Sequence, residues 1–315
     1  MNDKINKRIL ITNAGSAIGQ CVIDYSRENF SWLGGTDMNQ FCYAAKVLGD
    51  NFFQSPGYNN WAAYKEFLLG ICRKKKIDLL IPCAIDQELL WLARDRKELE
   101  ALGTKILASD YESIKICNDK YRCFEFVSGL GVKTPKIYLP QKIGKKTSFP
   151  FFFKKRESEG SALTQKIESQ SDLKYFSTKY KDSVLQELVS GEEFSIDMVL
   201  NNSSEMEFAC CRKRVETKAG VCTKTEFVAR EDLIKIAAFV AGKLKLIGGI
   251  NVQFIEDYFI EINPRFPGGM GLDCRAGFNM PLMSVKAFFD RSIEKNEKKL
   301  KAKKILRIWK EILYE

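Results

Sequence analysis

Short apolar runs and longer amphipathic segments alternate along the first third of the chain. Apolar runs with the length of buried strands cover residues 8–13, 31–35, 79–82 and 105–108. Helical periodicity fills the intervals between later runs, at residues 61–75 and 87–102. Strands that alternate with helices predict a parallel, doubly wound α/β sheet. We expect this first domain to cover residues 1–113.

The pattern changes after a helical segment at residues 114–129. Polar turns separate most of the strands that follow, which we expect at residues 149–154, 183–187, 193–200 and 205–212. Helices are expected at residues 172–179 and 231–243. This order predicts an α+β region with antiparallel strands. We expect a small, lid-like central subdomain over residues 114–188 and a C-terminal subdomain over residues 189–315.

The end of the chain, residues 298–315, predicts a basic amphipathic helix. Ile305, Trp309 and Ile312 share one helical face, and lysines cover the other faces. Such a helix can pack on its own domain, lie on an anionic membrane or dock on a partner protein. Packing on its own domain is the commonest of these outcomes, and the other two stay open.

Two alternating runs within residues 249–263 predict a β-hairpin. Side chains alternate between the two faces of a strand. If the apolar side chains meet in one core, Val252 must oppose Ile262 and Phe254 must oppose Ile260. That register requires a three-residue loop, which is a common hairpin length.

The same register gathers four oxygen-bearing side chains on the other face of the hairpin. Gln253 lies opposite Glu261, and Asn251 lies opposite Asn263, with about 4.5–5.5 Å between paired Cβ atoms. Carboxylate and amide oxygens are the ligands that Mg²⁺ prefers. The alternative is the solvated outer face of an edge hairpin.

An arginine and several glycines follow the hairpin directly, in Pro264-Arg265-Phe266-Pro267-Gly268-Gly269. A guanidinium beside a metal site suits a transferring phosphoryl group or an acyl phosphate. Glycines let the backbone approach a ligand closely. An ordinary Pro/Gly turn is the other interpretation.

Composition limits the chemistry. The chain has ten cysteines without a C-x-x-C pair and has no histidine, so neither a zinc site nor an imidazole base is expected. Free cysteines suit a reducing cytoplasm. Of the net charge of +10, residues 286–315 carry +5, from ten Lys or Arg against five Asp or Glu. The rest of the chain is only mildly basic, so no nucleic-acid partner is expected.

The hairpin residues resemble the metal-binding signature of the ATP-grasp superfamily, in particular the carbamoyl-phosphate synthetase large subunit and its stand-alone relatives. The resemblance implies an ATP-grasp fold behind an N-terminal Rossmann-like, pre-ATP-grasp domain. It implies that Glu261 and Asn263 bind Mg²⁺ with help from Gln253. It also implies that Arg265 steadies the γ-phosphate or an acyl phosphate, with Arg214 as a second catalytic candidate.

The resemblance extends to the nucleotide-binding positions. It implies that Lys120 and Lys154 contact the ATP phosphates and that Gly160 and Ser161 belong to the loop that covers them. Four further positions are implied to bind adenosine, with the adenine at Glu187, Leu188 and Val189 and the ribose at Glu193. The loop at residues 155–161 departs from the family pattern, because it is rich in charge and has a single glycine.

These assignments imply a cytoplasmic, ADP-forming ligase that joins a small carboxylate, such as an amino acid or a sugar acid, to an amine through an acyl phosphate. The implied cofactors are ATP and Mg²⁺. Arg275 is a candidate anchor for the substrate carboxylate, or else a surface arginine. No transmembrane segment is expected, and a homodimer stays open.

Two rival functions remain at this stage. Gly15 and Gly19 follow the first predicted strand and resemble a Rossmann turn, which would indicate an NAD(P)-dependent oxidoreductase. The full G-x-G-x-x-G pattern is absent, so this signal is weak. The second rival is a non-catalytic ATP-binding subunit.

Overall fold

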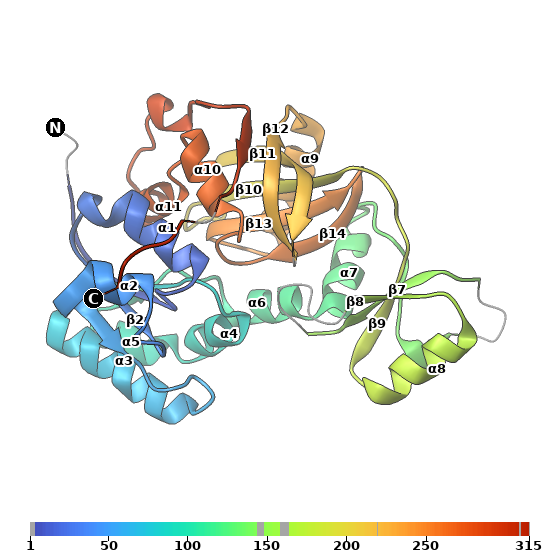
Figure 1. Cartoon of the computed structure of the whole chain (residues 1–315), viewed down its shortest axis with the longest axis horizontal. Coiled ribbons are helices and arrows are strands. Elements are labelled where there is room, and N and C mark those ends of the chain that lie inside the picture. The colour runs from blue at the N-terminus through green and yellow to red at the C-terminus, as the bar shows by residue number, and fades with distance from the viewer. Residues whose placement is uncertain (1–3, 144–147, 158–163, 219, 309, 315) are drawn as a thin grey trace.

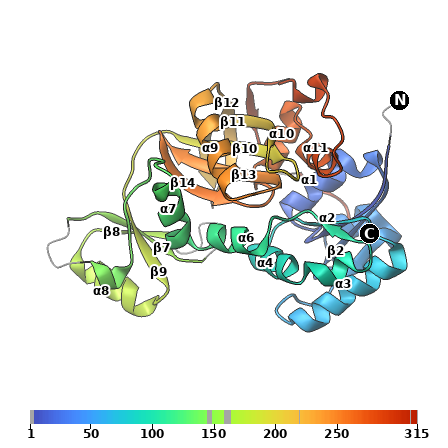
Figure 2. The same cartoon turned by 180° about the vertical axis from the view of Figure 1, so that it is seen from behind.

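The computed structural model describes residues 4–143, 148–157, 164–218, 220–308 and 310–314. Its strands form three separate sheets. The small four-stranded sheet and its helix form a lobe that projects from one end of the molecule (Figure 1). The view from behind shows the same lobe apart from the rest of the chain (Figure 2).

The N-terminal sheet is the predicted doubly wound sheet. Its five parallel strands have the order β3-β2-β1-β4-β5, and they are β1 (Ile5–Thr12), β2 (Phe30–Asp37), β3 (Phe52–Gln54), β4 (Leu79–Pro82) and β5 (Lys105–Ile106). The helices between them are α1 (Ala17–Ser26), α2 (Tyr43–Leu48), α3 (Trp61–Lys75), α4 (Asp86–Arg94) and α5 (Arg96–Glu100). The helix predicted at 87–102 is divided at Asp95, whose carboxylate accepts a hydrogen bond from the Trp61 indole at 2.7 Å.

The loop after β1 is held by a side chain from the end of β2. The carboxylate of Asp37, at the end of β2, accepts hydrogen bonds from the amides of Gly15 and Asn39, each at 2.9 Å. In a dinucleotide-binding domain, an acidic residue at this place hydrogen-bonds the ribose. Because both Asp37 oxygens accept hydrogen bonds from backbone amides, the geometry here gives no support to the oxidoreductase hypothesis.

The helix predicted at 114–129 is two helices, α6 (Tyr111–Asn118) and α7 (Lys120–Gly129). The break falls at Asp119, which has an extended backbone and accepts a hydrogen bond from the Arg122 amide at 3.2 Å. A carboxylate in this position caps the new helix. The same carboxylate pairs with Arg156 at 2.8 and 2.7 Å, so it also joins α7 to the end of strand β7 (Phe151–Lys155).

The small lobe is an antiparallel sheet with one covering helix. Its strand order is β6-β9-β7-β8, with β6 (Ile137–Tyr138), β8 (Thr164–Ile167) and β9 (Ser183–Glu187) around β7. Helix α8 (Gln170–Lys179) covers one face, where Leu173 packs against Phe151, Phe153 and Leu185. Residues of β7 with the opposite parity, Phe152 and Lys154, therefore face away from this core.

The C-terminal sheet is antiparallel throughout its described pairs. Its order is β14-β13-β10-β11-β12-β15, from β10 (Glu193–Leu200), β11 (Met206–Lys218), β12 (Val221–Phe227), β13 (Gly248–Ile255), β14 (Tyr258–Asn263) and β15 (Lys304–Leu306). Helices α7 and α9 (Glu231–Lys243) share a core with one face of this sheet. On the other face, α10 (Met270–Ala276) and α11 (Met280–Phe288) pack in one continuous core with β1 and α1 of the N-terminal domain.

The predicted C-terminal helix is wrong. Within the described part of residues 298–315, the chain forms strand β15, which pairs with β12 and becomes the edge strand of the sheet. Pairing with β15 gives partners to backbone groups of β12 that a C-terminal helix would leave unpaired at the edge of the sheet, as in the hydrogen bonds from the Phe227 amide to the Lys303 carbonyl and from the Arg307 amide to the Thr223 carbonyl, both at 2.8 Å. Tertiary contacts therefore override the helical period, and the membrane and partner contacts expected of that helix lose their basis.

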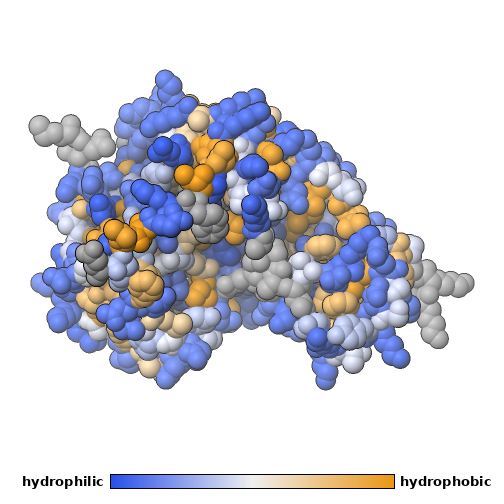
Figure 3. Space-filling model, viewed as in Figure 1, coloured by the Kyte–Doolittle hydropathy of each residue, from blue (hydrophilic) through white to orange (hydrophobic). Residues whose placement is uncertain are grey.

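After β15 the chain returns to the N-terminal domain. The Tyr314 hydroxyl donates a hydrogen bond to the Gln40 carbonyl at 2.8 Å, and its ring meets Phe41 edge-on with 4.5 Å between centroids. The face of the molecule in Figure 3 is mostly hydrophilic, with apolar side chains in scattered groups. Among the described residues, no helix has the length and apolar character needed to cross a bilayer.

Candidate functional site

The β13–β14 hairpin has the predicted register at its open end and a different one near its turn. Asn251 pairs with Asn263, Val252 with Ile262 and Gln253 with Glu261, as predicted. The expected pairing of Phe254 with Ile260 and the three-residue loop Glu256–Tyr258 are wrong. Phe254 instead pairs with Phe259, and the turn is Glu256-Asp257.

Ile260 is the extra residue of a β-bulge, which accounts for the changed register. The bulge lets Phe259 enter the core opposite Phe254 and turns the half-buried Ile260 toward a cavity. The two-residue turn places Glu256 at a φ of +53°, a left-handed conformation that is uncommon for a residue other than glycine. Binary alternation alone could not locate this bulge.

The polar face of the hairpin is an ordered set of amides and a carboxylate. Asn263 Nδ2 donates to Glu261 Oε1 at 2.7 Å, and Gln253 Nε2 donates to Asn251 Oδ1 at 3.1 Å. The amide nitrogens of Gln253 and Asn263 are thus used within the protein. Their oxygens and the second Glu261 oxygen form a donor set that fits a hard divalent cation such as Mg²⁺.

A cavity of about 420 Å³ lies between the small sheet and the C-terminal sheet. It brings together most of the site residues expected from the sequence, from the nucleotide-binding, catalytic and metal-binding groups: Lys120, Lys154, Glu187, Leu188, Val189, Glu193, Arg214, Gln253 and Glu261. Leu188 and Val189 lie in the segment that joins β9 to β10. The cavity walls thus come from both lobes. The expected loop positions Gly160 and Ser161 lie outside the described residues.

Sequence analysis missed the apolar walls of this cavity, which include Phe152, Ile255 and Ile260. The signal for Phe152 was present, because it has the same parity as Lys154 on β7. The planar ring of Phe152 and the aliphatic side chains of the two isoleucines suit the apolar faces of a nucleotide base.

Lys154 is buried at the floor of the cavity, where its amine donates a hydrogen bond to Gln186 Oε1 at 2.7 Å. Burial lowers the pKa of Lys154 to about 8, while the negative charge of Glu261 acts in the opposite direction. A desolvated ammonium gains more from an anionic ligand than one in water does. This amine is therefore well suited to a phosphate.

Arg214 and Arg265 each have an acidic partner. Arg214 Nε lies 3.1 Å from Glu193 Oε2, and Arg265 pairs with Asp86, with 3.3 Å between Nη2 and Oδ2. Asp86 begins helix α4, so the N-terminal domain contributes directly to the site. Both arginines line a second cavity of about 190 Å³, which shares Arg214, Gln253 and Glu261 with the larger one.

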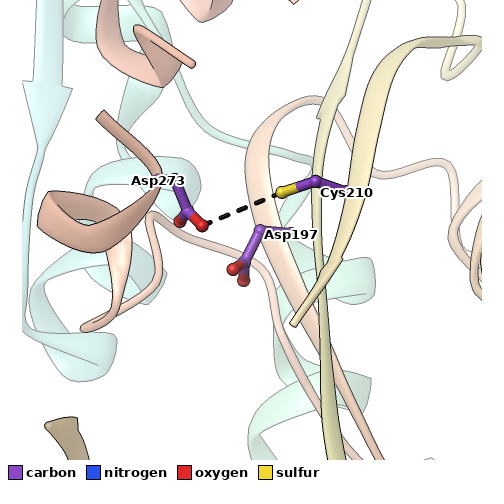
Figure 4. Close-up of side chains that lie close together, drawn as sticks. All are labelled: Asp197, Cys210 and Asp273. Carbon is purple, nitrogen blue, oxygen red and sulfur yellow. Dashed lines mark hydrogen bonds between the residues drawn. The ribbon is translucent and has the colours of Figure 1, made fainter. Parts of the chain in front are cut away.

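A buried cluster beside the second cavity contains Asp197, Cys210 and Asp273 (Figure 4). Their oxygen and sulfur atoms are close enough to suggest a metal site. The guanidinium of Arg212 supplies the positive charge between the two aspartates in place of a metal ion. Its Nε lies 2.6 Å from Asp197 and 2.7 Å from Asp273. Burial disfavours the charged guanidinium, but attraction to the two aspartates outweighs it and raises the pKa of Arg212.

Two sheets that enclose a nucleotide-sized cavity, with an amide and carboxylate face at its end, define the ATP-grasp fold. Residues 179–311 match a family model described as ATP-grasp in the biosynthetic pathway with Ter operon. Residues 9–107 match the model of a PylC-like N-terminal domain. The C-terminal part of the chain is therefore similar to an ATP-grasp domain, and the part before it is similar to a PylC-like N-terminal domain.

Curated relatives are carbamoyl-phosphate synthases. The chain is 24% identical over 220 residues to the enzyme of Methanobrevibacter smithii, a match that covers 63% of this chain and 60% of that one. It is 24% identical over 300 residues to the large chain of Helicobacter pylori carbamoyl phosphate synthase, covering 84% of this chain and 27% of the relative. The chain thus spans less than two thirds of the length of either relative.

A solved structure with the same fold is the biotin carboxylase domain of Hydrogenobacter thermophilus 2-oxoglutarate carboxylase, in complex with MgADP, ADP and bicarbonate. The TM-score is 0.74 at 13% identity, and the match covers 94% of this chain and 73% of the other. At this identity the likeness establishes the fold alone.

Proposed function

We propose that this chain is an ATP-dependent carboxylate–amine ligase that works through an acyl phosphate. The observation that carries the proposal is the shared wall between the two cavities. Glu261, Gln253 and Arg214 border both the nucleotide-sized cavity and the smaller one. A phosphoryl group at this boundary could be reached from a nucleotide on one side and from a second substrate on the other.

The residues of the larger cavity would hold ATP. Lys154 and Lys120 would neutralise the phosphates, since a triphosphate needs several cations around it. The exposed carboxylate of Glu193 would accept hydrogen bonds from the ribose hydroxyls. In that state Arg214 would exchange its pairing with Glu193 for contact with the terminal phosphate.

Glu261, Asn263 and Gln253 would hold Mg²⁺, which offsets phosphate charge when it is bound. A substrate carboxylate oxygen then attacks the γ-phosphorus, and the bond to the β–γ bridging oxygen breaks as ADP leaves. An amine next attacks the carbonyl carbon of the acyl phosphate. Phosphate leaves and the nitrogen loses a proton. Arg265 and Arg214 would stabilise the charge on the transferring group, so catalysis consists mainly of positioning and electrostatics.

Hydroxylamine trapping tests this proposal without knowledge of the natural amine. The protein is incubated with Mg-ATP, hydroxylamine and single carboxylates drawn from amino acids and sugar acids. An acyl phosphate would be captured as a hydroxamate, with ADP formed in equal amount. Bound ATP with neither product from any carboxylate would favour the alternative of a non-catalytic ATP-binding subunit.

A further inference from the structure

Arg212 ends a chain of hydrogen bonds that begins at the metal-binding face. Asn263 donates to Glu261 at 2.7 Å and, more weakly, to Asn251 at 3.4 Å. Asn251 Nδ2 in turn donates to Asp197 Oδ1 at 2.6 Å, and the other Asp197 oxygen binds Arg212. The position of this guanidinium is therefore coupled to that of the cation ligands.

The guanidinium of Arg212 has unused capacity at one nitrogen. The side chain is 1% exposed, and among the described residues no acceptor lies within hydrogen-bonding distance of Nη1. Nε and Nη2 are engaged by the aspartates. An unsatisfied buried donor is costly unless water or a ligand completes it. Arg212 borders the 190 Å³ cavity, so a ligand there could supply the acceptor.

The backbone leaves room for this guanidinium. A Cβ atom at Gly269 would lie 2.3 Å from Arg212 Nη2 and 3.0 Å from Nη1. The φ of Gly269 is −82°, which any residue can adopt. Glycine is therefore required here by the close approach of Arg212 and not by the backbone conformation. Gly269, which follows the β13–β14 hairpin, thus leaves space for Arg212 at the cavity wall.

The size and charge of the cavity define the ligand that fits it. Its volume of about 190 Å³ is less than half that of the nucleotide-sized cavity of about 420 Å³. Three arginines line it, Arg212, Arg214 and Arg265, against one carboxylate, Glu261. Guanidinium groups bind carboxylates through charge-assisted and often bidentate hydrogen bonds.

We propose that Arg212 anchors the acid substrate through Nη1 and that this substrate is a compact carboxylate of amino-acid size. The proposal rests on the ligase function and names the substrate class of its second cavity. It also replaces Arg275 as the carboxylate anchor, because Arg275 is exposed on α10 and does not border this cavity.

A purely structural ion cluster is the competing explanation for Arg212. Such a cluster would stabilise the fold and leave the affinity for carboxylates unchanged when the arginine is replaced by another cation. Substrate anchoring instead requires a donor at Nη1 while Nε and Nη2 hold the aspartates, and the single ammonium of a lysine cannot fill all these positions. The two explanations therefore differ in binding and not only in stability.

The test measures binding of carboxylates by calorimetry in the presence of Mg²⁺ and an ATP analogue with an imido group between the β- and γ-phosphates. The probes are the protein amino acids, D-alanine, D-glutamate, oxalate, malonate and succinate. Wild-type protein is expected to bind at least one of them, and Arg212→Lys should weaken that binding by about tenfold or more, as expected for a lost charge-assisted hydrogen bond. Affinity for the analogue should stay the same.

Arg275→Lys is the matched control, since it changes an exposed arginine on the neighbouring helix, and it should bind the carboxylate as wild type does. Failure of every probe to bind the wild-type protein would overturn the proposal, as would equal affinity in Arg212→Lys. If Arg212→Lys does not fold, Gly269→Ala supplies the second variant. It retains all charges but displaces the guanidinium, and it should weaken carboxylate binding while sparing the analogue.

Different results would refute the ligase function and the role of Arg212. Carboxylate binding that depends on Arg212 without hydroxamate formation would preserve the anchor and refute the ligase. Hydroxamate formation with equal carboxylate affinity in Arg212→Lys would preserve the ligase and refute the anchor.

Discussion

At the scale of single residues, Lys154 is the buried cation that the small lobe contributes to the larger cavity. Its amine is buried between β7 and β9, and Gln186, which accepts its hydrogen bond, is neutral. Sequence alternation on β7 was sufficient to place this side chain on the cavity face. Its burial and lowered pKa depend on the opposing sheet and could not be obtained from the strand alone.

Lys154→Ala should weaken ATP binding by about tenfold to a hundredfold, because one hydrogen bond to a charged group is worth about 1.5–3 kcal/mol. Lys155→Ala is the control, since Lys155 is the exposed neighbour on the same strand. Calorimetric titration with Mg-ATP compares the variants. Equal affinities in the two variants would contradict the proposed phosphate contact.

The same amine should make ATP binding depend on pH. Because the pKa of Lys154 is lowered to about 8, the amine is charged below that pH and loses its charge above it. Affinity for ATP should therefore fall as pH rises through about 8, by up to about tenfold per pH unit. Lys154→Arg keeps its charge, so its affinity should change less over the same range.

At the scale of elements, Asp119 determines where helix α7 begins. It caps α7, and its pair with Arg156 ties the helix to the end of β7. The Lys120 amide also donates to the Arg156 carbonyl at 3.0 Å. The continuous apolar pattern over residues 114–129 concealed this break, because the cap acts together with a strand more than thirty residues away.

Asp119→Ala should lower the free energy of unfolding by about 1 kcal/mol more than Asp119→Asn does, because asparagine retains the cap and alanine does not. Both variants lose the ion pair with Arg156. Denaturant titration of the two proteins measures the difference. Equal losses would show that the ion pair, and not the cap, holds the start of α7.

The hairpin and the last strand show which elements a sequence can specify. Alternation gave three cross-strand pairs and the polar face of the β13–β14 hairpin, because a shift of one residue would expose the core. It did not predict the bulge at Ile260. Either Phe259 or Ile260 could oppose Phe254 in the core, because both side chains are apolar. The periodicity of residues 298–315 was misleading, since the edge of β12 offered a strand partner.

At the scale of the whole molecule, the site is assembled from segments that are far apart in the chain. Asp86 of the N-terminal domain pairs with Arg265, and the Arg212 cluster draws on β10, β11 and α10. Local patterns predicted the polar face of the β13–β14 hairpin and most of the strands around it. They could not identify the partners of Arg212, because those contacts exist only after three distant elements have packed together.

The most direct test of the ligase proposal is ADP release from Mg-ATP in the presence of panels of small carboxylates and amines, with Glu261→Ala measured in parallel. The account predicts release that requires both a carboxylate and Mg²⁺ and that disappears in the variant, because Glu261 borders both cavities and is the carboxylate proposed to bind Mg²⁺. Unchanged ADP release in folded Glu261→Ala would contradict the account.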